Sequence, residues 1–169
     1  METIEYKNHI IKIVHDDCAE SPREWDNLGT MYFLHKRYNL GDKHNLDSED
    51  IQAIENDDNY ISLPVYMYDH SGYTIRTTPF SCMFDSGKLG IIAIHKDKVK
   101  KEFGKKRISK KLRAKILEYL DDEVKTYDDF LTGNVYGYQI EDLTGNEIES
   151  CYGFIGDADY CLREAKACL

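Results

Sequence analysis

Apolar residues recur every three to four positions along residues 109–130, and this spacing constrains the fold more than any other feature of the chain. They are Leu112, Ile116, Leu120, Val124 and Tyr127. A stripe of this period lies along one face of an α-helix and is buried against a core. The sequence therefore predicts a long amphipathic helix over residues 109–130.

The charges of this predicted helix are reversed relative to the arrangement that stabilises a helix. The helix dipole favours anions at the N-terminus and cations at the C-terminus, and each misplaced exposed charge costs about 0.3–1 kcal/mol. Residues 109–130 begin with Lys110, Lys111, Arg113 and Lys115, and they end with Asp121, Asp122, Glu123, Asp128 and Asp129. A locally unfavourable choice without an evident benefit marks a place to look for function.

The basic end of this helix belongs to a longer basic block, residues 96–115. The block holds 11 of the 22 Lys and Arg residues and only two acidic residues, a net charge of +9. The rest of the chain has 11 basic and 29 acidic residues, a net of −18, so the whole chain carries −9. Such a block can contact the phosphate backbone of nucleic acid or an acidic protein face.

We therefore expect the partner- or phosphate-binding residues to be Lys101, Lys105, Lys106, Arg107, Lys110, Lys111 and Arg113. The alternative is a solvated helical face whose cations neutralise acidic neighbours within the fold. Phe103 is the one aromatic residue of the block, so the sequence does not indicate base stacking on it.

The remaining pattern is dominated by predicted strands. Residues 4–14 are predicted to form one strand with Ile11 and Ile13 on the same face, and residues 89–95 a central apolar strand. Residues 30–38 are predicted to form a strand, with a helix continued to Tyr38 as the alternative. Two hairpins are predicted, 61–68 with 73–78 through the loop 69–72, and 135–141 with 147–154 through the loop 142–146.

Short helices complete the predicted set. Ser21 and Ser48 are predicted to cap two of them, and Asp157 a last one over residues 158–168. Antiparallel hairpins without βαβ alternation predict the α+β class, with a mainly antiparallel sheet and one long helix. The sequence predicts a single domain over residues 1–169.

Other candidate sites are weaker. The acidic residues Asp16, Asp17, Glu20, Glu24 and Asp26 could bind Mg²⁺ or Ca²⁺, but their spacing matches no EF-hand loop. The stretch Asp85–Gly90 is predicted to be a tight turn, because a phosphate-binding P-loop follows a strand and does not precede one. We assign no metal ligand and no cofactor.

The five cysteines are odd in number and widely spread, which predicts reduced thiols and no disulfide framework. Cys82 and Cys151 sit among aromatic residues, and a nucleophilic role would need a base such as His70 or His95 within hydrogen-bond reach. We expect them to be small hydrophobic side chains instead, so no catalytic residue is assigned.

The strings SPREWDNLGTM (21–31), YDHSG (68–72), PFSCMFDSG (79–87) and SCYGFIG (150–156) together resemble a group of small proteins encoded by bacteriophages and prophages. The resemblance spans most of the chain. It implies an accessory role in the cytoplasm of an infected bacterial host, and it assigns a role to no individual residue.

Three hypotheses for function follow. The first is a phage accessory protein without catalysis, which inhibits a host defence complex, a CRISPR–Cas effector or restriction machinery, through segregated acidic and basic surfaces. The second is a nucleic-acid-binding protein that contacts phosphates through residues 100–113. The third is a metal- or cysteine-dependent enzyme acting on a small molecule. No apolar run is long enough to span a membrane, and the first residues do not resemble a signal peptide.

Overall fold

The computed structural model describes residues 2–82 and 84–169, which divide into two compact units. Unit 1 combines both ends of the chain, up to Pro22 and from Asp129 onward, and unit 2 is the intervening stretch Arg23–Asp128. Helices and antiparallel sheets make up similar shares of the chain, so the predicted α+β class is confirmed. The single domain over residues 1–169 stays a prediction.

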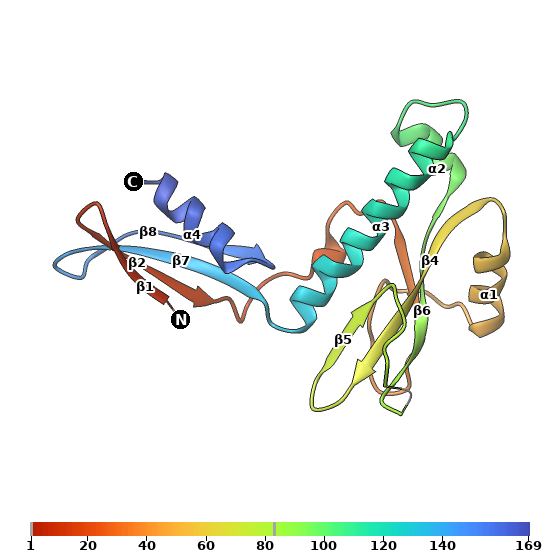
Figure 1. Cartoon of the computed structure of the whole chain (residues 1–169), viewed down its shortest axis with the longest axis horizontal. Helices are drawn as coiled ribbons and strands as arrows, with labels where there is room; N and C mark the ends of the chain where they lie inside the picture. Colours follow the sequence, from red (N-terminus) through yellow and green to blue (C-terminus); the bar gives the residue numbers. More distant parts are fainter. Residues whose placement is uncertain (1, 83) are drawn as a thin grey trace. The chain divides into compact units, whose positions relative to one another are not determined.

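Unit 1 is a four-stranded antiparallel sheet with a helix on one face (Figure 1). Its strands β1 (Glu2–Tyr6), β2 (His9–His15), β7 (Val135–Asp142) and β8 (Glu147–Ile155) lie in the order β1-β2-β7-β8, and α4 (Ala158–Ala167) packs against them. The core consists of Ile11, Ile13, Tyr138, Ile140, Cys161 and Ala165. Asp157 caps α4 as predicted, because its carboxylate accepts the backbone N–H of Asp159 at 2.8 Å.

The predicted single strand over residues 4–14 is wrong, because a tight turn divides it into β1 and β2. Lys7 and Asn8 both have positive φ, 47° and 63°, the combination that reverses a chain within two residues. The predicted side-chain faces are nevertheless confirmed. Ile11 and Ile13 are buried together, whereas Ile10 and Val14 on the other face are partly exposed.

Unit 2 contains the second antiparallel sheet and most of the helices. Its strands β3 (Thr30–Phe33), β6 (Ser86–His95), β4 (Tyr60–Asp69) and β5 (Tyr73–Arg76) lie in the order β3-β6-β4-β5. The chain also forms the 3₁₀ turn η1 (Pro22–Glu24), α1 (Ser48–Asn56), α2 (Lys96–Glu102) and α3 (Lys110–Leu131). The hairpin of β4 and β5 and that of β7 and β8 confirm both predicted hairpins.

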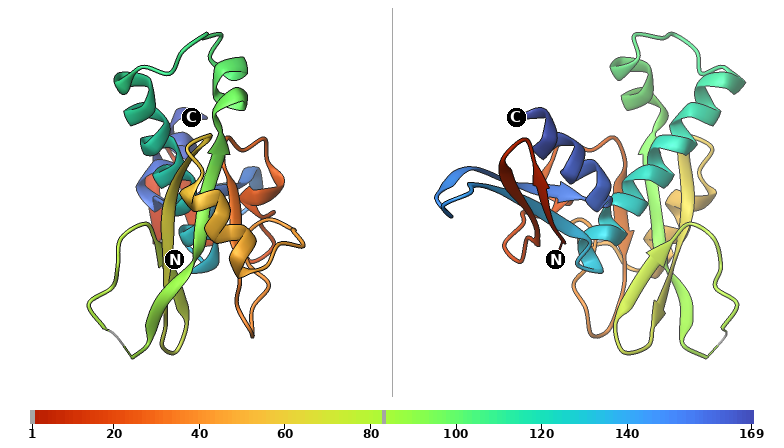
Figure 2. Two further views of the ribbon diagram at one scale, coloured as in Figure 1. Left: turned by 90° about the vertical axis from the view of Figure 1, so that its right-hand side faces the viewer. Right: turned by 60° about the vertical axis from the view of Figure 1, so that its left-hand side comes forward.

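The helices α1 and α3 cover opposite faces of the sheet of unit 2 (Figure 2). Ile91 and Ala93 of β6 pack with Ile51 of α1. Ile92 lies between them in sequence and points to the other face of the sheet, which α3 covers. Gly29 lies close to both Ile92 and Leu120 of α3, because a Cβ built on Gly29 would be 2.8 Å from Ile92 and 2.4 Å from Leu120. The predicted long helix is confirmed, and its side chains Ile116, Leu120, Val124 and Tyr127 are buried.

Several boundaries differ from the predictions. The stretch predicted as a turn, Asp85–Gly90, is wrong from Ser86 on, because β6 begins there and pairs with β4 across a register shift. β3 ends at Phe33, since the next four residues are exposed and offer no face to the core. Asp47 caps α1 in place of Ser48.

In the part of the chain that the structure describes, no helix is both long and apolar enough to cross a membrane.

Candidate functional site

The basic block forms a helical hairpin, made of α2, the connecting loop and the first turns of α3, which we call the basic hairpin (residues 96–115) (Figure 2). α2 was not predicted, because its sequence KDKVKKE has a single apolar residue, Val99, which is fully buried. The helix begins where His95 Nδ1 accepts the backbone N–H of Asp97 at 3.2 Å.

Backbone hydrogen bonds fix both ends of the loop. Gly104 has φ +58°, and the bonds from Lys105 N to Lys100 O (2.9 Å) and from Gly104 N to Lys101 O (3.3 Å) form the Schellman arrangement that ends helices. Ser109 begins α3, since its hydroxyl accepts the N–H of Leu112 at 3.2 Å. The basic side chains are therefore presented by a defined backbone.

All seven basic residues predicted as partner-binding are exposed on this hairpin. They are Lys101, Lys105, Lys106, Arg107, Lys110, Lys111 and Arg113. Among residues 2–82 and 84–169, none of them forms an ion pair within 4.0 Å. The structure thus brings the predicted residues together and does not support the alternative that they neutralise acidic neighbours in the fold.

Other lysines of the block are used within unit 2. Lys98 Nζ donates to the carbonyl oxygens of Asn27 and Leu28 at 2.9 and 3.0 Å, and Lys100 pairs with Asp97 at 2.7 Å. Lys96 Nζ donates to the carbonyl of Asp58. The lysines that stabilise the hairpin are therefore different from the seven exposed cations.

The acidic half of α3 behaves in the opposite way, because its carboxylates have partners in the fold. Asp128 accepts the N–H of Ile75 at 2.7 Å and the hydroxyl of Thr74 at 2.8 Å. Asp121 accepts the hydroxyl of Thr77 and pairs with Lys125 at 2.7 Å. Burial opposes ionisation of Asp121, but the hydrogen bonds from Lys125 and Thr77 outweigh it and lower its pKa.

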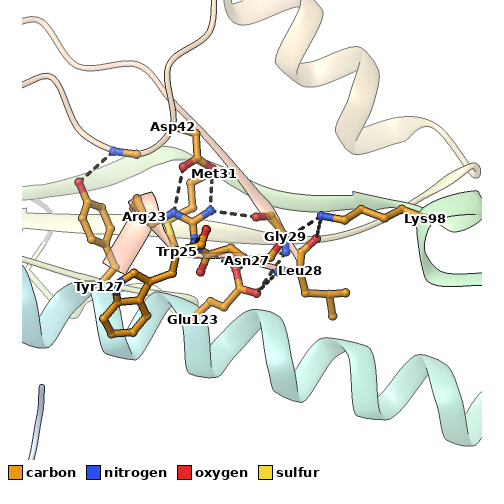
Figure 3. Close-up of polar contacts among 11 residues, drawn as sticks. Arg23, Trp25, Asn27, Leu28, Gly29, Met31, Asp42, Lys98, Glu123 and Tyr127 are labelled. Atoms are coloured by element: carbon orange, nitrogen blue, oxygen red, sulfur yellow. Dashed lines mark hydrogen bonds and ion pairs between the residues drawn. The ribbon is translucent and has the colours of Figure 1, made fainter. Parts of the chain in front are cut away.

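Arg23 and Glu123 form the centre of a polar cluster of unit 2 (Figure 3). The Arg23 guanidinium, 5% exposed, donates two hydrogen bonds to Asp42 (3.0 and 2.6 Å), one to Glu123 (3.0 Å) and one to the carbonyl of Gly29 (2.9 Å).

Both carboxylates of this cluster also accept backbone N–H groups. Asp42 accepts Met31 N at 2.7 Å, and Glu123 accepts Leu28 N at 2.7 Å. Burial would lower the pKa of Arg23, yet the hydrogen bonds and charges of the two carboxylates raise it. Glu123, Asp121 and Asp128 thus attach the helix to its own sheet and loops, whereas the basic half of the reversed helix still needs a functional explanation.

Among the described residues, no hydrogen bond joins Cys82 or Cys151 to a histidine. Cys82 Sγ and His70 Nδ1 both contact Asp85 Oδ2, at 3.7 and 3.3 Å. Cys151 is exposed. Burial raises the pKa of the Cys161 thiol to about 11, with a smaller contribution from Cys151, and this keeps Cys161 in its unreactive thiol form near neutral pH.

The acidic residues considered as metal ligands do not converge in the described part of the chain. Asp16 accepts the backbone N–H groups of Cys18 and Gly153, both at 3.0 Å. Among the described residues, no three His, Cys, Asp or Glu side chains are grouped so that they could hold a metal ion.

Comparison of the chain with protein-family models, with curated proteins and with solved structures gives no match. The resemblance to proteins encoded by bacteriophages therefore stays a prediction.

Proposed function

We propose that this protein binds the phosphate backbone of nucleic acid through the seven cations predicted as partner-binding, all of which are exposed on the basic hairpin. The observation that carries the proposal is the difference between the two halves of α3. The acidic half has hydrogen-bond partners within unit 2, whereas the basic residues that begin the helix have no ion-pair partner among the described residues. Cations that oppose the helix dipole without a partner in the fold are best explained by a partner outside it.

Phosphate groups suit these side chains. Lys and Arg neutralise phosphates and release the counterions condensed on the nucleic acid, which makes binding strong at low salt and weak at high salt. Arg107 and Arg113 can in addition form two parallel hydrogen bonds to one phosphate. The seven residues fall within residues 101–113, so their charges act on one region of a ligand.

Binding to a mixed-sequence duplex is expected to fall by about 10²- to 10⁴-fold between about 50 and 200 mM salt, the change that four to seven phosphate contacts produce. Fluorescence polarisation with a labelled duplex measures this. The slope of log affinity against log salt then gives the number of contacts. Negligible binding at the lowest salt, or an affinity independent of salt, contradicts the proposal.

A second candidate function has its own observation, the acidity of unit 1. This unit carries 13 acidic and four basic residues, a net charge of −9. Its two edge strands expose Glu2 and Glu5 on β1, and Glu147 and Glu149 on β8. An acidic surface can occupy a groove built for nucleic acid, so we also propose that the protein inhibits a host defence complex.

In bacteria with an active restriction or CRISPR–Cas system, expression of the protein is expected to increase the survival of a targeted plasmid. Replacing these four glutamates with Gln should abolish the protection, because it removes four charges from the acidic surface. A matched variant changes Glu24, Asp26, Asp58 and Glu118 of unit 2 to their amides and should retain protection. Equal plasmid survival with and without the protein contradicts this function for the system tested.

A further inference from the structure

The aromatic side chains beside the basic hairpin are already in contact with one another. The rings of Phe103 and Tyr119 stack with centroids 6.3 Å apart and an angle of 22° between their planes. Lys115 Nζ lies over the Tyr119 ring, 5.2 Å from its centroid. Tyr119 is 38% exposed and Phe103 is half-buried. Part of the Tyr119 ring is therefore already in contact with a neighbouring ring and an ammonium group, and part of the Phe103 ring is in contact with Tyr119.

The position of the hairpin loop also bears on the kind of nucleic acid that it can bind. This loop, which contains Lys105, Lys106 and Arg107, lies at one end of unit 2, remote from the turn between β4 and β5 (Figure 2). Proteins that bind single strands combine a charged groove with aromatic rings that stack on successive bases. A basic loop at one end of the unit instead suits the rows of phosphates along a double helix, where charges are most closely spaced.

From these observations we infer that the ligand of the basic hairpin is double-stranded nucleic acid, bound by its backbone without base stacking. The inference rests on the proposed phosphate-binding function and specifies its substrate class. It also means that the affinity is independent of base sequence, because phosphate contacts position a protein on a duplex without reading its bases.

The first test compares three probes of equal length, about 20 nucleotides per strand: duplex DNA, duplex RNA and an unstructured single strand. Each phosphate contact contributes a salt exponent of about 0.9 on duplex DNA and about 0.7 on a single strand. Seven contacts then favour duplex DNA about 10- to 30-fold at about 0.1 M salt. Preference for either duplex over the single strand supports the inference, and the DNA and RNA probes identify which duplex is bound.

The second test uses Phe103→Leu and Tyr119→Leu in the full chain. Each is expected to change the affinity for every probe by less than about 2-fold, because neither ring contacts a base. A stacked ring is worth about 1–3 kcal/mol per base, so its loss would weaken single-strand binding about 5- to 150-fold. Thermal unfolding confirms that each variant is folded, and Lys106→Gln is the matched control that should weaken binding about 8-fold at about 0.1 M salt.

Different results contradict the preference for duplexes and the phosphate binding. A single strand that binds as tightly as the duplex, or a Tyr119→Leu variant that loses single-strand binding, overturns the inference and leaves the proposed phosphate binding intact. Binding to none of the three probes overturns the proposed function itself.

Discussion

Replacing Lys105, Lys106, Lys110 and Lys111 together with Gln is expected to weaken duplex binding by about 10³- to 10⁴-fold at about 0.1 M salt, because each lost phosphate contact removes about an 8-fold contribution. The same variant is expected to melt at the parent temperature or slightly above it. Lys110 and Lys111 stand in the first turn of α3, where cations oppose the helix dipole, and none of the four side chains pairs with an acid among the described residues.

Binding titrations and thermal unfolding of the same samples measure both effects. The matched control removes four positive charges elsewhere, at Lys7, Lys36, Lys43 and Lys166, and should retain most of the affinity. A quadruple hairpin variant that melts earlier than the parent and still binds would show that these lysines stabilise the fold and do not serve a partner.

The Arg23→Met variant is expected to lose about 3–5 kcal/mol of unfolding free energy, because it leaves two partly buried carboxylates without their guanidinium partner. Asp42 and Glu123 would retain only their backbone N–H donors, and the contact between η1 and α3 would be lost. Urea unfolding followed by circular dichroism measures the loss.

Arg163→Met is the matched control, since Arg163 is exposed, and it should change the stability little. Adding Asp42→Asn to Arg23→Met should recover part of the loss, because an amide is less costly than an unpaired carboxylate in the same place. Additive losses in the double variant would show that the two side chains act independently.

The sequence predicts those elements whose local pattern agrees with their packing. The apolar stripe of α3 and the turn residues of the two hairpins suffice to predict these elements, because side-chain period and turn chemistry act within a few residues. The turn at Lys7–Asn8 was missed since it contains neither Gly nor Pro, and both residues adopt a left-handed conformation that sequence rarely signals for Lys. α2 was missed because a single buried residue, Val99, gives no period to detect.

In the candidate site too, features set by neighbouring residues could be predicted from the sequence, whereas contacts between distant residues could not. Charge composition alone identified the basic block that carries the seven predicted cations, since the number of Lys and Arg in a short block is visible in the sequence. Composition could not show which acids are used by the fold. Arg23 meets Glu123 a hundred residues later in the chain, and Asp128 meets the N–H of Ile75, so these partners depend on the arrangement of α3 on its sheet.

The chain order of the two units has a consequence for synthesis on the ribosome. β2 pairs with β7, as in the match of Ile11 with Ile140, so the hairpin of β1 and β2 emerges long before its partner strand. An isolated two-stranded hairpin is marginal in water. Unit 2 is continuous in sequence and emerges completely before β7. The middle of the nascent protein is therefore expected to fold before its beginning, which stays incomplete until α4, the last helix, covers Ile11 and Ile13.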